Sequence, residues 1–302
     1  MKKSLWIFAL IVLLSLSLIA VGCSKQEEPN QEGEGTQEEA PPQEKQEVEL
    51  TYVEWDSEVA STNVVRAVLQ EKMGYDVEIT PVGAAAMWQA VSTDDVDGMV
   101  AAWLPTTHGQ YLEEVKDNVE DLGPNLEGTL IGLVVPEYVT INSIEELNAN
   151  AEKFDGKIIG IDPGAGLMSS TEKVMEEYGL TNFELVEGTG ATMTAALADA
   201  VKNEEWVVVT GWTPHWKFGR WDLKYLEDPK KIYGEEEFIN TIVRKGLKED
   251  MPEVYNFLDK FHWTPDDMAQ VMVWNQEDGA DPYETAKRWV DENEDKVNEW
   301  LE

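Results

Sequence analysis

The sequence predicts an α/β fold of two lobes, each a mixed, mostly parallel sheet flanked by helices, with a hinge that the chain crosses twice. An internal repeat carries this prediction. Residues 48–91 and 157–197 share one order of strand, small-residue loop, helix, glycine-containing stop, strand and Gly/Ala loop. Asp56 of the first copy matches Asp162 of the second. Alternating strands and helices with short connections are typical of parallel sheets covered by helices.

A third strand completes each copy of the repeat. The segments 97–108 (DGMVAAWLPTTH) and 206–216 (WVVVTGWTPHW) both end an apolar run in Trp-x-Pro, at Trp103 and Trp212. Ligands of such sheets bind beyond the carboxyl ends of the strands. We therefore expect two lobes whose loop ends face each other across a cleft.

Two further apolar stretches, residues 131–139 and 239–247, indicate extended passages between the lobes. We expect lobe 1 to comprise residues 48–138 and 240–302, and lobe 2 to comprise residues 139–239. The C-terminal part has apolar residues at helical spacing and should pack as helices on lobe 1. Its tryptophans are expected to serve packing rather than a site: Trp263, Trp274, Trp289 and Trp300.

Composition excludes several classes of function. The 302 residues carry 60 acidic and 23 basic side chains, a formal net charge of −37, which repels the phosphates of nucleic acids. The sequence has no GxSxG segment, its only cysteine is Cys23, and no pair among its three histidines has metal-ligand spacing. It therefore predicts a protein that is not an enzyme, needs no metal or cofactor, and has no nucleic acid as a partner.

The N-terminus is typical of a secretion signal. Lys2 and Lys3 precede an apolar stretch, residues 5–21, which leads into IAVGC with Cys23 at its end. A single thiol cannot form an internal disulfide, so we expect residues 1–22 to be removed as a lipoprotein signal peptide and Cys23 to carry the lipid. An uncleaved membrane anchor with an inert cysteine is the alternative.

An acidic tether is expected after the signal. Residues 23–47, which begin with the lipidated cysteine, are rich in Glu, Gln and Pro and lack aromatic side chains, so this segment should stay disordered. Either interpretation of the N-terminus places the rest of the chain outside the cytoplasm. We expect it to be anchored to the outer face of the cell membrane.

Three tryptophans are expected to face the cleft. Trp103 and Trp212 occupy equivalent positions at strand ends, and Trp88 lies at the start of the helix after GAAAM. Indole faces attract a cation that has no N–H to donate, such as a quaternary ammonium, with roughly 0.5 to 2 kcal/mol per contact. For each ring taken alone, a lid on the core is the alternative. The internal symmetry favours a shared aromatic box.

The segment IDPGAGLMSSTEK, residues 161–173, is expected to hold an anion. It runs from a strand through a Gly-rich turn into a helix, which leaves the N–H groups of Gly166 and Leu167 unpaired. An ordinary tight turn is the alternative. His108 follows Trp103 by five residues and can donate a hydrogen bond into the same cleft. Structural roles are expected for the other two histidines, His215 and His262.

These motifs resemble one family. Segments spread over residues 48–302 are similar to those of the extracellular glycine betaine-binding lipoproteins of bacterial ABC osmoprotectant importers: WDSEVASTNV, MWQAV, AWLPTTHGQYL, GLVVPEY, GIDPGAGLMSSTEK, VVTGWTPHW and LKYLEDPK. The resemblance implies a two-lobed fold like that of type II periplasmic binding proteins and a membrane permease as partner. Some members of the family begin with the DPGxG half, whereas this chain begins with the WDSE half.

The resemblance also implies roles for particular residues. The trimethylammonium group of the ligand would lie in a prism of three indoles: Trp88, Trp103 and Trp212. The carboxylate would be held by the backbone N–H groups of Gly166 and Leu167 and by the side chain of His108. In this chain Leu167 stands where the family pattern has Ile, a change that leaves the backbone donor intact.

The sequence therefore predicts a receptor that captures glycine betaine, with proline betaine as a further candidate, and delivers it to an ABC permease. A choline or carnitine receptor of the same class would keep the aromatic box and change the anionic end. A membrane-anchored surface hydrolase, from a different class, would need an activated nucleophile, and the sequence offers no candidate for one.

Overall fold

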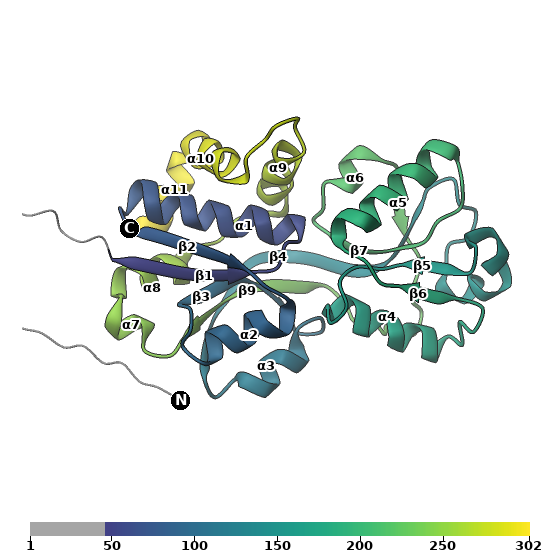
Figure 1. Ribbon diagram of the computed structural model, residues 1–302, viewed down its shortest axis with the longest axis horizontal. Helices are drawn as coiled ribbons and strands as arrows, with labels where there is room; N and C mark the ends of the chain where they lie inside the picture. Colours follow the sequence, from purple (N-terminus) through teal and green to yellow (C-terminus); the bar gives the residue numbers. More distant parts are fainter. Residues whose placement is uncertain (1–45) are drawn as a thin grey trace, which may run out of the picture. The chain divides into compact units, whose positions relative to one another are not determined.

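Strands from both copies of the repeat join one hydrogen-bonded path in the computed structural model, which describes residues 46–302. The order along the path is β2-β1-β3-β9-β4-β7-β5-β6, with β8 paired to β4 beside it (Figure 1). The predicted signal peptide, the lipidation at Cys23 and nearly all of the predicted tether lie outside the described residues.

The three strands of the first repeat are parallel neighbours in the order β2-β1-β3. Their bounds are β1 (Glu47–Tyr52), β2 (Asp76–Pro81) and β3 (Gly98–Leu104). The connecting helices are α1 (Asp56–Ala67), its π-helical continuation η1 (Val68–Lys72), and α2 (Ala84–Ser92). Figure 1 shows α1 and α2 on opposite faces of these strands.

The second repeat has the same topology, with parallel neighbours in the order β6-β5-β7. Its strands are β5 (Lys157–Ile159), β6 (Glu184–Val186) and β7 (Val209–Thr213). Its helices are α4 (Gly166–Glu177) and α5 (Gly190–Asn203). Because the strand order, direction and helix positions agree, the α/β repeat predicted from sequence is present in the fold.

Two antiparallel strands, β4 (Val119–Pro136) and β9 (Glu237–Arg244), lie between the repeats. The first part of β4, up to Thr129, pairs with β9. The part from Leu130 onward pairs with β7 and with β8 (Leu223–Tyr225). The predicted passage at residues 131–139 is thus largely the end of a longer strand that serves both groups of strands.

We call β2, β1, β3, β9 and the first part of β4 the first half-sheet, and the end of β4 with β7, β5, β6 and β8 the second half-sheet. We propose that these half-sheets are the cores of the two lobes, lobe 1 (48–138 and 240–302) and lobe 2 (139–239). In this division the partner of β4 changes at Leu130, earlier in the chain than the proposed boundary.

The remaining helices are short. Two 3-10 segments and two helices lie in the middle of the chain: α3 (Gly109–Val115), η2 (Ile144–Glu146), η3 (Asn148–Phe154) and α6 (Lys217–Arg220). Five form the C-terminal part: α7 (Leu247–Asp250), α8 (Pro252–Lys260), α9 (Pro265–Asn275), α10 (Pro282–Glu292) and α11 (Glu294–Leu301). Within residues 46–302 no helix combines the length and apolar character that crossing a bilayer requires.

The C-terminal helices complete the core beside the first half-sheet. Helices α9 and α10 pack against α1, and α8 and α9 pack against β4 (Figure 1). Trp289 and Trp300 are stacked with an interplanar angle of 11°, and Trp263 meets Trp289 edge to face. All three rings are buried, and so is that of Trp274, as the sequence predicts for these four tryptophans.

The start of α1 is unusual because it buries polar side chains. Ser57 and Glu58, in its first turn, are each about 1% exposed, and Glu58 Oε2 accepts a hydrogen bond from the backbone N–H of Val53. A helix start that buries polar groups must lie against another part of the protein, because buried polar groups need partners. For Ser57 that part is the second half-sheet, because its Oγ accepts a hydrogen bond from Trp212 Nε1.

Candidate functional site

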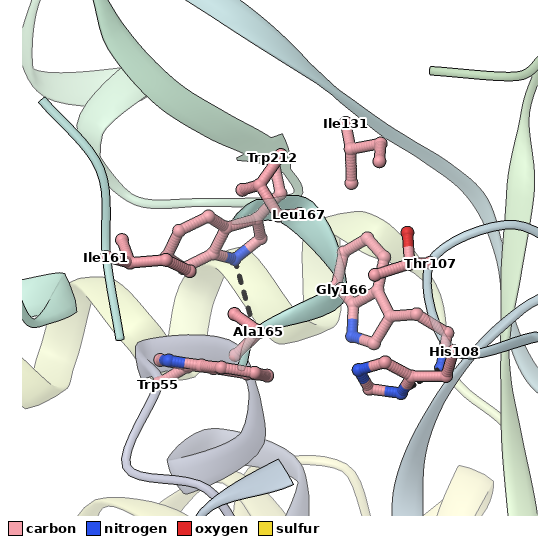
Figure 2. Close-up of a pocket in the computed structure, with 11 residues that line it drawn as sticks. Trp55, Thr107, His108, Ile131, Ile161, Ala165, Gly166, Leu167 and Trp212 are labelled. Atoms are coloured by element: carbon pink, nitrogen blue, oxygen red, sulfur yellow. Dashed lines mark hydrogen bonds between the residues drawn. The ribbon is translucent and has the colours of Figure 1, made fainter. Parts of the chain in front are cut away.

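One small pocket lies where the loops of the two repeats meet (Figure 2). It contains about 320 Å³ of space, open solvent at its mouth included. Residues from both half-sheets line it: Trp55, Ser57, Trp103, Thr107, His108, Ile131, Ile161, Ala165, Gly166, Leu167 and Trp212. Aliphatic and aromatic side chains dominate this lining, and no carboxylate, ammonium or guanidinium group of the described residues is part of it.

Three indoles line the pocket, and strand ends position each of them. Trp103 is the last residue but one of β3, and Trp212 is the last residue but one of β7. Trp55 follows β1 and is the residue that precedes helix α1. The rings are only 4 to 7% exposed. Parallel strands of α/β sheets end at the edge where ligands bind, so this clustering follows from the topology.

Two of the indole rings are oriented by hydrogen bonds from one repeat to the other. Trp55 Nε1 donates to Asp162 Oδ2 at 2.9 Å, and Trp212 Nε1 donates to Ser57 Oγ at 3.2 Å (dashed line in Figure 2). Asp162 lies in the second repeat and Ser57 in the first. Because each N–H is satisfied at the ring edge, these hydrogen bonds do not cover the ring faces.

His108 contributes a hydrogen-bond donor. The backbone N–H of Trp103 donates to His108 Nδ1 at 3.2 Å, so the proton of the neutral ring resides on Nε2. Nε2 is buried and has no hydrogen-bond partner among the described residues. Burial lowers the pKa of His108 to about 3, which keeps the imidazole neutral at physiological pH. The pocket is therefore lined by a ring with one unpaired N–H.

The start of helix α4 contributes two more donors. Helix α4 begins at Gly166, and the side chain of Ala165 before it provides no cap. The first N–H groups of a helix have no acceptor within the helix, so those of Gly166 and Leu167 need an external partner. Both residues line the pocket. The helix dipole adds a partial positive charge there, which favours an anionic group.

Gly166 also permits a close approach between the repeats. A Cβ atom built at Gly166 would lie 1.9 Å from the carbonyl oxygen of Thr107, a distance that no side chain could occupy. The loop of Thr107 is fixed in turn, because Glu237 Oε1 accepts hydrogen bonds from the backbone N–H groups of Thr106 and Thr107 at 2.7 and 2.8 Å. Tyr111 Oη donates to the carbonyl oxygen of Gly164 at 2.6 Å and closes the same contact.

The structure brings five of the six residues expected at the ligand site into one pocket: Trp103, Trp212, His108, Gly166 and Leu167. The sixth, Trp88, does not line it. Trp88 is 1% exposed, meets His108 edge to face at 6.0 Å and stacks on Tyr111 at 6.5 Å. Helix α2 packs on α3, and this packing turns Trp88 behind His108.

Trp55 takes the place in the pocket that the sequence argument gave to Trp88. A usable signal was present in the sequence, because the repeat alignment pairs Asp56 with Asp162 and so places Trp55 opposite Ile161. Both residues lie two to three positions beyond the end of the first strand of their repeat, and both line the pocket. The carboxyl ends of the first strands thus supply pocket residues as those of the third strands do with Trp103 and Trp212.

Comparison with known proteins assigns the family. Residues 46–292 match the family model described as the substrate binding domain of an ABC-type glycine betaine transport system. The chain belongs to this family. Its members are solute-binding proteins of importers and not enzymes, and such a protein works outside the cytoplasm.

Three relatives illustrate the similarity. The structure of lactococcal OpuAC, closed and complexed with glycine betaine, is 46% identical, with a TM-score of 0.81 over 85% of this chain and 100% of that one. The glycine/betaine/L-proline-binding protein ProX of Borrelia burgdorferi is 41% identical, with a TM-score of 0.82 over 85% and 97%. The curated glycine betaine/carnitine transport binding protein GbuC of Listeria monocytogenes is 49% identical over 153 residues, 50% of this chain and 51% of GbuC.

These relatives confirm the predicted fold class, because the two structures share this α/β architecture over nearly their whole length. The alignment with the Listeria protein spans only about half of that relative.

We predict that His108→Asn reduces the loss of stability on acidification. The folded protein holds the pKa of His108 at about 3, far below the ordinary 6.5, so only the unfolded chain binds a proton there at mildly acidic pH. The proton therefore favours unfolding as the pH falls below 6.5, by about 2 kcal/mol at pH 5. Urea denaturation at pH 7 and pH 5 should show a smaller fall in unfolding free energy for the variant than for the wild type. Equal falls would mean that His108 is protonated in the folded state.

Proposed function

We propose that this protein is the extracytoplasmic receptor of an ABC importer and binds glycine betaine in the pocket between the two repeats. The observation that carries the proposal is the convergence of three indoles and three unpaired N–H donors on one small pocket. The family match and the betaine complex of the lactococcal relative support the same ligand. Proline betaine has the same two charged groups and is a further candidate.

The indoles of Trp55, Trp103 and Trp212 suit the trimethylammonium end of the ligand. A quaternary ammonium has no N–H to give to a carboxylate, but its methyl groups bury well against aromatic rings whose faces are electron-rich. Each such contact contributes roughly 0.5 to 2 kcal/mol when it is desolvated. Three rings together contribute a few kcal/mol, which is only part of the roughly 8 kcal/mol that micromolar affinity requires, so the carboxylate end must contribute as well.

The donors of Gly166, Leu167 and His108 suit the carboxylate end. Two backbone N–H groups at the start of α4 and the Nε2–H of a neutral imidazole can satisfy the oxygens without an ion pair. A ligand that joins a methylated cation to a carboxylate by a short link thus has a matching group at each end of the pocket. Choline, which has no carboxylate, would leave these donors unpaired.

The proposed cycle needs the two lobes to move apart and to close on the ligand. Residues of both repeats form the pocket walls, and the bonds of Trp55 and Trp212 join the repeats only when these walls meet. The closed receptor would then deliver the ligand to a membrane permease. We include a lipid anchor at Cys23 in this proposal, on the strength of the IAVGC segment that ends the N-terminal signal.

Isothermal titration calorimetry against a panel of ligands tests the proposal. We expect glycine betaine to bind more tightly than dimethylglycine, which lacks one methyl group, and more tightly than choline. The expected difference for choline is about tenfold or more, because buried donors that lose their acceptor cost more than 1 kcal/mol. Choline or carnitine binding as tightly as glycine betaine would favour the alternative receptor, and turnover of an ester or glycoside would favour a hydrolase.

The assignment of Trp55 in place of Trp88 can be tested with matched substitutions. Trp55→Leu removes one wall of the aromatic box and should weaken glycine betaine binding about tenfold or more, since one desolvated cation–π contact approaches 2 kcal/mol. Trp88→Leu makes the same chemical change behind His108 and should weaken binding less than threefold. The reverse ranking of the two variants would restore Trp88 to the box.

Gly166→Ala should prevent the closed arrangement. The new methyl group would overlap the carbonyl oxygen of Thr107, so the repeats could no longer approach, and glycine betaine affinity should fall by about a hundredfold or more. Gly109→Ala is the matched control, because a Cβ atom there meets nothing within 4 Å. Small-angle X-ray scattering with and without glycine betaine should show compaction for the control and none for Gly166→Ala. Compaction of both would contradict the role of this contact in closure.

A further inference from the structure

A group of charged and polar side chains lies next to Trp212, outside the lining of the pocket. Lys217, the first residue of α6, is fully buried, and its Nζ lies 4.3 Å from the centroid of the Trp212 ring. The Nζ atom has no hydrogen-bond partner among the described residues. A buried ammonium without a partner is costly, so its environment must supply a compensating charge.

Asp56 supplies that charge from the other repeat. It is the first residue of α1, where the helix dipole favours an anion, and its Oδ1 accepts a hydrogen bond from Gln276 Nε2 at 3.1 Å. Burial opposes ionisation of this carboxyl, but the contact with His215 and the charge of Lys217 hold its pKa below the ordinary value. Asp56 is therefore an anion at neutral pH, and its charge acts on the lysine that the second repeat buries.

His215 lies between these two groups as a neutral ring. The backbone N–H of Lys217 donates to His215 Nδ1 at 3.1 Å, so the ring proton resides on Nε2. Nε2 lies 3.5 Å from Asp56 Oδ2, at the outer limit of a hydrogen bond. Burial, with the charge of Lys217, lowers the pKa of His215 to about 4, so the ring carries no charge at neutral pH. Its plane meets Trp212 edge to face at 4.6 Å.

We propose that Asp56 is a positioning residue of the ligand site: when the lobes close, its carboxylate offsets the ammonium of Lys217 that contacts Trp212. This inference rests on the proposed binding of a trimethylammonium ligand by Trp212. In the closed complex the same indole then contacts two cations, the ligand and Lys217, and each weakens the attraction that the ring offers to the other. When closure brings the Asp56 carboxylate close to Lys217, it removes much of this loss of attraction between Trp212 and the ligand.

The carboxylate of Asp56 can offset the ammonium of Lys217 only when the lobes are closed. Asp56 belongs to the first repeat, whereas His215 and Lys217 belong to the second, so separation of the lobes would separate the two charges. The negative charge of Asp56 raises the lysine pKa, although burial dominates and lowers it to about 7. Trp212 of β7 and Phe218 of α6 face Lys217 with rings alone, and Gln276 after α9 is uncharged.

Calorimetric titration with glycine betaine tests the proposed role of Asp56, and it compares the affinities of four proteins: wild type, Asp56→Asn, Lys217→Met and the double variant. At pH 6 we expect Asp56→Asn to weaken binding about tenfold, which is the cost of deprotonating a group with a pKa of about 7 at that pH. In the Lys217→Met background the same substitution should weaken binding less than threefold, because the ammonium that Asp56 offsets is gone. Asp199→Asn, on the exposed face of α5, removes the same charge elsewhere and should leave affinity unchanged.

A pH series on wild type and Asp56→Asn provides a second test that needs no substitution of a buried residue. Asp56 stays ionised and both His108 and His215 stay neutral from pH 6 to 9, so Lys217 is the member of this group that titrates. The ratio of the two affinities should fall from about ten at pH 6 to less than three at pH 9. A constant ratio, or an equal effect of Asp56→Asn in both backgrounds, would overturn the inference and leave the proposed function intact. A wild type that does not bind glycine betaine would overturn both.

Discussion

The exchange of indole hydrogen bonds between the two repeats is the interaction on which the site depends. Trp55 of the first copy donates to Asp162 of the second, and Trp212 of the second donates to Ser57 of the first. These bonds fix the orientation of two indoles of the box, and in both the acceptor belongs to the opposite repeat. Ring orientation and lobe contact are thereby coupled, so an aromatic box of this shape exists only when the repeats meet.

The two repeats are equivalent in their strands and helices, but two equivalent histidines have different surroundings and different roles. His108 and His215 both follow a Trp-x-Pro segment, accept a backbone N–H at Nδ1 and have a strongly lowered pKa because they are buried. Their Nε2–H groups nevertheless differ in surroundings. His108 lines the pocket, whereas His215 faces the carboxylate of Asp56. One copy of the motif thus provides a donor at the pocket and the other helps to join the lobes.

The sequence predicted the features that depend on local pattern and missed those that depend on packing. The repeat gave the strands, their parallel order and the equivalence of Trp103 and Trp212, because each of these follows from a short segment. The position of Trp88 depends on how α2 packs against α3, which no periodicity records. The first part of the continuous strand β4, residues 119–130, was not predicted, because Gly123, Pro124 and Gly128 are typical of turns and only the apolar part from residue 131 indicates an extended passage. Trp55 was detectable from the alignment of Asp56 with Asp162.

The distribution of charge explains how such a pocket can distinguish a betaine from an ordinary cation. The described residues that line it carry no formal charge, although the whole chain has a net charge of −37. A carboxylate in the pocket would hold any amine through an ion pair, and a lysine there would repel the trimethylammonium group. Neutral donors and ring faces instead require both ends of a zwitterion at once. Asp56 and Lys217 lie just outside the lining, where their charges can stabilise the closed walls without attracting the wrong ligand.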